Sequence, residues 1–166
     1  MRRTGVFHFT ALSVFLVLAG CANPPPTAAP APQASACPAT GTQMCVRPLL
    51  APNFLSWPPG DGSQGDTTEI TLPAGTLIDR FGGDGGSYFS PKGIPFGQRA
   101  LPYVCDLRAY RVFRVEKSFT VIRGTIRPWF GEPGLGTQYL AQQNVGELLD
   151  AGNIVEVPVQ PEDSPC

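Results

Sequence analysis

The segment between Leu72 and Pro102 contains side chains that could bind a phosphate-bearing ligand with a flat ring. They comprise two guanidinium groups, two aromatic rings and a carboxamide: Arg80, Phe81, Tyr88, Gln98 and Arg99. Guanidinium groups bind phosphate oxygens through paired hydrogen bonds and stack on planar rings. Glycines on both sides of Asp84 leave bare backbone between these side chains. We therefore expect a nucleotide-like ligand in this segment.

The histidine content excludes several kinds of catalysis. The single histidine of the chain is His8, which lies in a predicted targeting sequence, so the mature protein has no imidazole. Mechanisms of the Ser-His-Asp and Cys-His types, and metals ligated by histidine, are excluded for this reason. Proton transfer near neutral pH would have to come from a carboxylate with a shifted pKa.

The charge balance argues against a nucleic-acid partner. Without Arg2 and Arg3 the chain has ten basic and thirteen acidic residues, which gives a net charge of −3. Proteins that bind nucleic acids are expected to be basic. The arginines between residues 107 and 115 are therefore interpreted as charges on a strand face.

A β-hairpin is predicted to position the candidate residues around Arg80. Thr76–Phe81 alternates as a half-buried strand, and Ser87–Ser90 is the expected return strand, which ends at Pro91. Four glycines are expected to supply positive φ angles for the turn: Gly82, Gly83, Gly85 and Gly86.

Further strands are predicted downstream of this hairpin. Leu107–Val115 alternates along a strand, and Phe119–Arg127 is predicted to pair with it as a hairpin through residues 116–118. Asn153–Val159 is the last predicted strand, whereas Asp61–Asp66 is expected to be a solvated loop without the spacing of a calcium site.

One clear helix is expected at Asn144–Asp150. Asn144 is the predicted N-cap, Glu147 occupies the third helical position and Gly152 follows the end. Many short strands, few short helices and frequent Gly/Pro turns predict an α+β, mainly β domain of two small packed antiparallel sheets.

The N-terminal region has the composition of an export signal and a tether. The predicted division of the chain is a signal peptide at 1–20, a Pro/Ala-rich tether at 22–36, an irregular N-terminal lobe at 37–59 and a domain at 60–166. Cys21 ends a lipobox-like LAGC and would carry a lipid, so we expect an exported lipoprotein anchored to a membrane surface. Secretion without an anchor is the alternative. Trp57 is expected to pack beneath the main body.

The cysteine count fits an exported, oxidised domain. Of five cysteines, a lipidated Cys21 leaves an even number for two disulfides: Cys37, Cys45, Cys105 and Cys166. Three connectivities are possible, and Cys37–Cys45 with Cys105–Cys166 is the preferred one. Metal binding by these cysteines is disfavoured because no CxxC spacing is present.

Four blocks of sequence resemble, in order, the tuberculosis necrotizing toxin domain family. They are LPAGTLIDRFGGDGGSYFSP, GIPFGQRALP, RPWFGEPGLGTQYL and LLDAGNIVEV, and they lie within Trp57–Val157. The family comprises NAD glycohydrolases of bacterial toxins and fungal surfaces. The resemblance implies two sheets that meet around a cleft, similar to the core of ADP-ribosyltransferases.

The resemblance also implies roles for individual residues. Arg80 and Arg99 match arginines that bind the NAD phosphates, and Phe81 matches an aromatic that packs against the nicotinamide ring. Tyr88 matches a tyrosine needed for activity. Gln138, in GTQYL, matches a glutamine that would hold the nicotinamide ribose and orient the attacking water.

The expected function is hydrolysis of NAD+ or NADP+ to nicotinamide and ADP-ribose through an oxocarbenium-like transition state, without a cofactor. The alternatives are an envelope lipoprotein that binds a nucleotide without turnover, and a mono-ADP-ribosyltransferase. The resemblance implies an inhibitor protein in the producing cell as a partner. Fungal relatives carry a calcium site near the C-terminal end, for which Glu162 and Asp163 would be the candidate ligands here.

Overall fold

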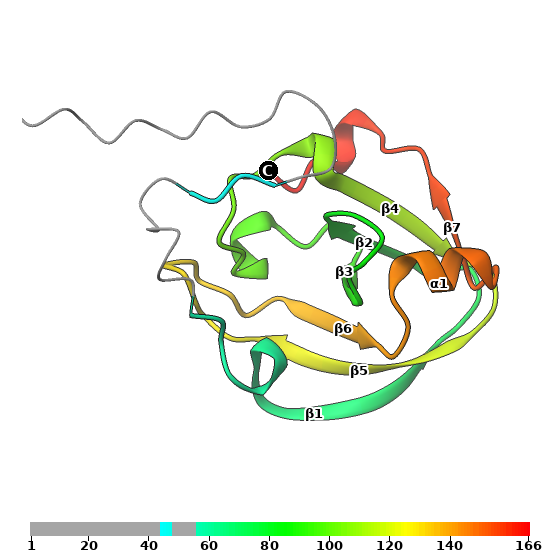
Figure 1. Cartoon of the computed structure of the whole chain (residues 1–166), viewed down its shortest axis with the longest axis horizontal. Coiled ribbons are helices and arrows are strands. Elements are labelled where there is room, and N and C mark those ends of the chain that lie inside the picture. The colour runs from blue at the N-terminus through cyan, green and yellow to red at the C-terminus, as the bar shows by residue number, and fades with distance from the viewer. Residues whose placement is uncertain (1–43, 48–55) are drawn as a thin grey trace, which may run out of the picture. The chain divides into compact units, whose positions relative to one another are not determined.

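Seven strands and one short α-helix form the described part of the chain, which comprises residues 44–47 and 56–166 of a computed structural model (Figure 1). Their bounds are β1 (Ser63–Leu72), β2 (Leu77–Phe81), β3 (Tyr88–Pro91), β4 (Tyr110–Val115), β5 (Phe119–Ile126), β6 (Thr137–Ala141), α1 (Val145–Asp150) and β7 (Ile154–Val157). The predicted signal peptide, Cys21, the tether and most of the N-terminal lobe lie outside the described residues. None of the described helices is long and apolar enough to cross a bilayer.

The strands are hydrogen-bonded in the order β1-β5-β6-β3-β2-β4-β7, and every pairing is antiparallel. The predicted class, α+β and mainly β with few short helices, is confirmed. The two halves expected as separate sheets are joined through β3, which pairs with β6 on one side and β2 on the other. In Figure 1, β1, β5 and β6 form one half, and β4 with β7 belongs to the other.

Two apolar clusters hold β2 from opposite sides. Ile78 packs with Phe89, Phe113 and residues of α1 in the larger cluster, whereas Phe81 packs with Phe96 and other residues in the smaller one. Successive side chains of a strand point to opposite faces. β2 therefore places Arg80 on the face of Ile78 and Asp79 on the face of Phe81.

The predicted helix is confirmed with its capping box. The Asn144 side chain accepts from the Glu147 amide at 2.9 Å, and the Glu147 side chain accepts from the Asn144 amide at 2.9 Å. Gly152 follows the helix with φ +64°, as a left-handed position after a helix end favours glycine.

Three other predictions are wrong. Asp61–Asp66 is not a loop, because β1 begins at Ser63. The strand expected from Leu107 begins only at Tyr110, after a 3₁₀ turn at Leu107–Ala109. β5 does not form a hairpin with β4, because β2 and β7 occupy both edges of β4 and β5 pairs with β1 and β6.

The glycine turn between β2 and β3 differs from the prediction. Among its four glycines only Gly82 has a positive φ, +107°. Gly86 is needed for a different reason, since a Cβ there would lie 2.2 Å from Nη2 of Arg80. The turn therefore uses glycine partly to admit the Arg80 guanidinium.

The preferred pairing of Cys105 with Cys166 is confirmed. It closes a sequence separation of 61 residues and fastens the C-terminal tail to the domain. Cys37 lies outside the described residues, so its proposed bond to Cys45 stays a prediction.

Candidate functional site

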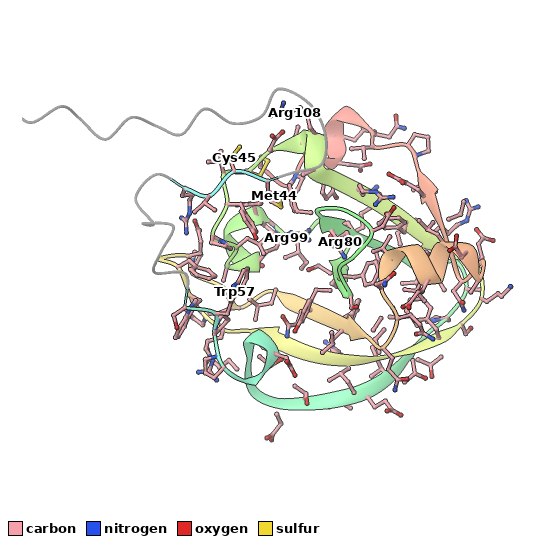
Figure 2. The ribbon with its side chains drawn as sticks, viewed as in Figure 1. Met44, Cys45, Trp57, Arg80, Arg99 and Arg108 are labelled. Carbon is pink, nitrogen blue, oxygen red and sulfur yellow. A yellow bond between two sulfur atoms is a disulfide. The ribbon has the colours of Figure 1, made fainter. Side chains whose placement is uncertain are left out.

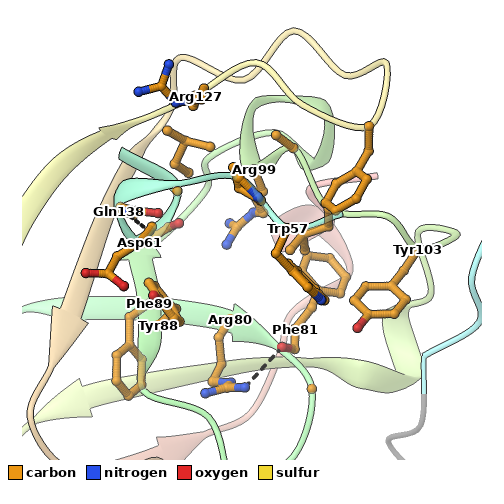
Figure 3. A pocket seen from close by; sticks show the side chains of 18 of the residues that line it. Trp57, Asp61, Arg80, Phe81, Tyr88, Phe89, Arg99, Tyr103, Arg127 and Gln138 are labelled. Atoms are coloured by element: carbon orange, nitrogen blue, oxygen red, sulfur yellow. Dashed lines mark hydrogen bonds between the residues drawn. The ribbon is translucent and has the colours of Figure 1, made fainter. Parts of the chain in front are cut away.

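A cavity of about 950 Å³ opens between the two halves of the sheet, a volume that suits a ligand of dinucleotide size (Figure 3). Every residue that the sequence assigned to NAD lines it: Arg80, Phe81, Tyr88, Arg99 and Gln138. Arg80 and Arg99 lie centrally in the structure, with Trp57 nearby (Figure 2). Residues from β2, β3, β6 and a 3₁₀ turn are thus brought together by the fold.

Arg80 is a half-buried cation with few partners. Its Nη2 donates to the carbonyl of Phe81 at 3.4 Å, while Nε and Nη1 are buried and have no hydrogen-bond partner among the described residues. Its guanidinium lies 5.9 Å from the Phe89 ring centroid. Burial lowers the pKa of Arg80 to about 10, and the nearby Arg111 cation contributes to the decrease. A guanidinium held in this way is prepared to bind an anion.

Arg99 differs because the protein already satisfies much of its hydrogen-bonding capacity. It lies on the 3₁₀ turn Phe96–Arg99, pairs with Asp79 at 2.6 Å and donates twice to the carbonyl of Ile94, at 3.0 and 2.8 Å. Asp79 also accepts from the Tyr110 hydroxyl at 2.7 Å. Burial raises the pKa of Asp79, against the opposing effect of Arg99. Arg99 therefore gives the cavity a fixed positive charge, but most of its N–H groups are already hydrogen-bonded within the protein.

Gln138 is oriented by two hydrogen bonds that its side-chain amide donates. The side chain is 8% exposed, and its Nε2 donates to the Asp61 carbonyl at 2.9 Å and to Ser63 Oγ at 2.8 Å. Gly124, opposite Gln138 on β5, leaves room for Ser63, because a Cβ there would lie 2.4 Å from Ser63 Oγ. With both amide hydrogens used, Oε1 is the atom of Gln138 that remains to accept from a ligand hydroxyl.

The two aromatic candidates have different environments. Tyr88 is 43% exposed, and burial together with the Asp61 carboxylate raises the pKa of its phenol. Phe81 is buried against Phe96 and Tyr110, with ring centroids 4.8 and 5.1 Å away. Tyr88 is therefore available to a ligand, whereas Phe81 mainly forms the apolar floor of the cavity.

The sequence did not identify several residues that line the cavity: Met44, Trp57, Asp61, Tyr103, Arg127 and Phe130. Trp57 is not packed beneath the body as expected, because it is 56% exposed and contacts Phe130 edge-on at 5.5 Å. Lone glycines in strands mark places where other groups approach closely. Gly124 could have pointed to Ser63 in this way, but the sequence contains no comparable signal for Asp61 or Trp57.

The calcium candidates lie away from this arrangement. Asp163 pairs with Lys92 at 2.6 Å, and Glu162 is exposed. Within residues 44–47 and 56–166, no three side chains of histidine, cysteine, aspartate or glutamate are grouped as a metal site would require.

The family model described as tuberculosis necrotizing toxin matches residues 71–157, just over half of the chain. The chain belongs to the tuberculosis necrotizing toxin family. The match includes Arg80, Tyr88, Arg99 and Gln138, but it does not reach the cavity wall at residues 57–62.

A curated relative of this member of the tuberculosis necrotizing toxin family is the conidial surface nicotinamide adenine dinucleotide glycohydrolase nadA of Aspergillus fumigatus. It is 39% identical over 118 residues, covering 62% of this chain and 50% of the relative. The chain thus spans about half the length of the relative.

Solved structures of similar fold include one member of each of two protein complexes. Tuberculosis necrotizing toxin complexed with its immunity factor IFT is 26% identical, with 60% of each chain covered and a TM-score of 0.49. Tse6 in complex with Tsi6 is 17% identical, with 57% of this chain and 73% of that chain covered and a TM-score of 0.40.

Proposed function

We propose that this protein is an NAD glycohydrolase, which hydrolyses NAD+ or NADP+ to nicotinamide and ADP-ribose. The observation that carries the proposal is the convergence of three side chains in one cavity of dinucleotide size: Arg80 with two unpartnered nitrogen atoms, an accessible Tyr88 and an oriented Gln138. Family membership and the name of the relative nadA support the same reaction.

The cavity offers positive charge for the pyrophosphate of the substrate. Arg80 would bind phosphate oxygens with its free Nε and Nη1 atoms, and Arg99 would contribute its fixed charge. Arg127 also lines the cavity, and its Nη2 donates to the Ser63 carbonyl at 3.0 Å, so it would add positive charge at the rim.

The reaction itself requires little acid–base chemistry. The nicotinamide ring nitrogen is positively charged in NAD+ and leaves neutral, so no acid has to protonate it. The protein must hold the ribose while positive charge develops at C1′, and it must place a water molecule. Gln138 would accept a ribose hydroxyl at Oε1, because Asp61 and Ser63 fix its orientation.

A carboxamide at position 138 favours water over a protein acceptor. A neutral amide cannot remove the proton of an acceptor side chain, which a mono-ADP-ribosyltransferase would need. We therefore propose hydrolysis rather than protein modification.

We further propose that the protein acts outside the cytoplasm. The Cys105–Cys166 disulfide is typical of oxidising compartments, and the relative is named as a conidial surface protein. A lipid anchor at Cys21 and an inhibitor protein in the producing cell stay predictions.

The test is nicotinamide release from NAD+ by the purified full chain. Q138A and R80A should each lower kcat/KM by about 100-fold or more, since both remove groups that position the substrate. The matched controls are Q142A and R123A, whose exposed side chains lie outside the cavity.

The outcomes separate the alternatives. Tight binding of NAD+ without nicotinamide release would replace the proposal by a nucleotide-binding protein without turnover. Transfer of label from NAD+ to a protein would favour the transferase.

A further inference from the structure

A short left-handed turn places an exposed acidic residue at the wall of the cavity. Gly60, Asp61 and Gly62 all have positive φ angles, of 64°, 52° and 77°, and Asp61 lines the cavity beside Tyr88 and Gln138 (Figure 3). Aspartate tolerates this backbone region better than most residues, but glycine would adopt it without any Cβ penalty. The backbone of this turn accepts either aspartate or glycine.

Asp61 is connected to both polar residues at this end of the cavity. Its carbonyl accepts from Nε2 of Gln138 at 2.9 Å. Its carboxylate is close enough to Tyr88 to perturb the phenol electrostatically. Any ribose that contacts Gln138 and Tyr88 would therefore also be close to this carboxylate.

The cavity wall contains both positive and negative side chains, as the substrate contains both negative and positive groups. Asp61 is the single acidic side chain among the residues that line the described cavity, while Arg80, Arg99 and Arg127 are its cations. NAD+ has an anionic pyrophosphate and a cationic nicotinamide ring. Attraction between opposite charges would place the pyrophosphate at the arginines and the cationic ring at Asp61.

We propose that Asp61 is a catalytic carboxylate of this reaction, which faces the nicotinamide riboside and takes the proton of the attacking water. This inference rests on the proposed function. The bond between C1′ and the ring nitrogen breaks with its electron pair going to nicotinamide, and the water oxygen forms the new bond to C1′. The water proton passes to the Asp61 carboxylate and then to solvent, so the products are nicotinamide, ADP-ribose and one proton.

The negative charge has a second effect on the same step. Positive charge spreads over the ribose as the bond to the leaving group lengthens, and a nearby carboxylate stabilises that charge. The chain has no histidine after His8. Asp61 therefore supplies the base that a histidine provides in many hydrolases.

The experiment compares D61N with D66N in the full chain. Asp66 is an exposed carboxylate of β1 outside the cavity, and asparagine tolerates the left-handed backbone at position 61. D61N should lower kcat by about 100-fold, the usual size of a general-base contribution, with a much smaller change in KM. D66N should keep the wild-type kcat.

A second variant separates catalysis from folding. D61G suits the backbone and leaves space for a small anion, so added formate should restore part of its kcat and should not accelerate wild type. Binding of ADP-ribose, which lacks the cationic ring, should be unchanged in D61N and D61G and shows that the cavity is intact.

Three results would overturn the inference. An active wild type with an equally active D61N removes Asp61 from the reaction while the proposed function stands. Loss of activity in D61G without any rescue by formate, accompanied by loss of ADP-ribose binding, assigns Asp61 a purely structural role. A wild type that releases no nicotinamide overturns the proposed function and this inference together.

Discussion

Arg80 shows how a binding residue can reduce the stability of the protein that carries it. Its buried Nε and Nη1 atoms lack partners among the described residues, and Arg111 is a neighbouring cation. Buried donors without partners cost about 1–3 kcal/mol each. The protein therefore leaves part of the Arg80 guanidinium unsatisfied, and hydrogen bonds to an anionic ligand would offset that cost.

R80M should stabilise the unliganded protein while abolishing nicotinamide release. Methionine keeps the apolar stem over Phe89 and removes the charge, so the free energy of unfolding should rise by about 1 kcal/mol. Burial disfavours the charged form of Arg80 and lowers its pKa to about 10. The resulting loss of folding stability is therefore fully present below that pKa, and it decreases as the pH rises through it. Thermal unfolding without ligand measures this change, and a lower Tm for R80M would contradict it.

Gly124 controls Gln138 through Ser63. In G124A the new Cβ would lie 2.4 Å from Ser63 Oγ, so Ser63 must move and Gln138 loses a hydrogen bond that orients it. A displacement of about 1 Å can lower a rate by about 100-fold, so we expect kcat to fall by about 10- to 100-fold. Steady-state kinetics test this, with T125A as the exposed neighbouring control; an unchanged kcat would show that Ser63 does not position Gln138.

At the scale of elements, α1 fastens the turn that surrounds Arg80. The amides of Val145 and Gly146 donate to the carbonyls of Gly86 and Asp84, at 3.0 and 3.1 Å. The Asp84 side chain also pairs with Arg111 at 2.5 Å. The helix therefore positions the glycine turn, although its own side chains do not line the cavity.

N144A should affect both stability and substrate binding. Loss of the N-cap lowers helix stability by about 1 kcal/mol, and the loosened α1 would release the turn at Gly86. We expect a lower Tm and a raised KM for NAD+, with little change in kcat. The adjacent exposed Gln143 provides the control variant Q143A. Equal KM values in the two variants would show that α1 does not influence substrate binding.

For the whole molecule, the C-terminal tail supports the wall that carries Arg99. The Phe96 amide, at the start of the Arg99 turn, donates to the Pro165 carbonyl at 2.8 Å. The next residue, Cys166, is bonded to Cys105. The tail thus connects the end of the chain to the cavity wall.

The double variant C105A/C166A should destabilise the protein by about 2–4 kcal/mol, because the unfolded chain loses the constraint of a long closed loop. KM for NAD+ should rise as well, since the Phe96–Arg99 turn loses its anchored partner. Chemical denaturation and kinetics measure the two effects. Wild type treated with a reductant should behave like the variant, and a variant of unchanged stability would show that the bond contributes little.

Local patterns predicted much of the fold. The β2–β3 hairpin, the capping box of α1 and the strand near Ile154 depend on short-range alternation and capping, which neighbouring residues encode directly. The strand β1 was missed because its side chains are mostly exposed, so it lacks the apolar alternation by which a strand is recognised. The β4–β5 hairpin was wrong because both edges of β4 are taken by strands distant in sequence.

The amino-acid sequence by itself determined the types of group available for chemistry: arginines, a tyrosine, a glutamine and no histidine after His8. Tertiary structure decided how these groups are buried and paired. It leaves two nitrogen atoms of Arg80 without partners and pairs Arg99 with Asp79. It also adds Asp61 and Trp57 to the cavity wall. The physical reason is that residue types are local properties. Burial, pairing and the charge pattern of a cavity arise only when segments far apart in the sequence come into contact.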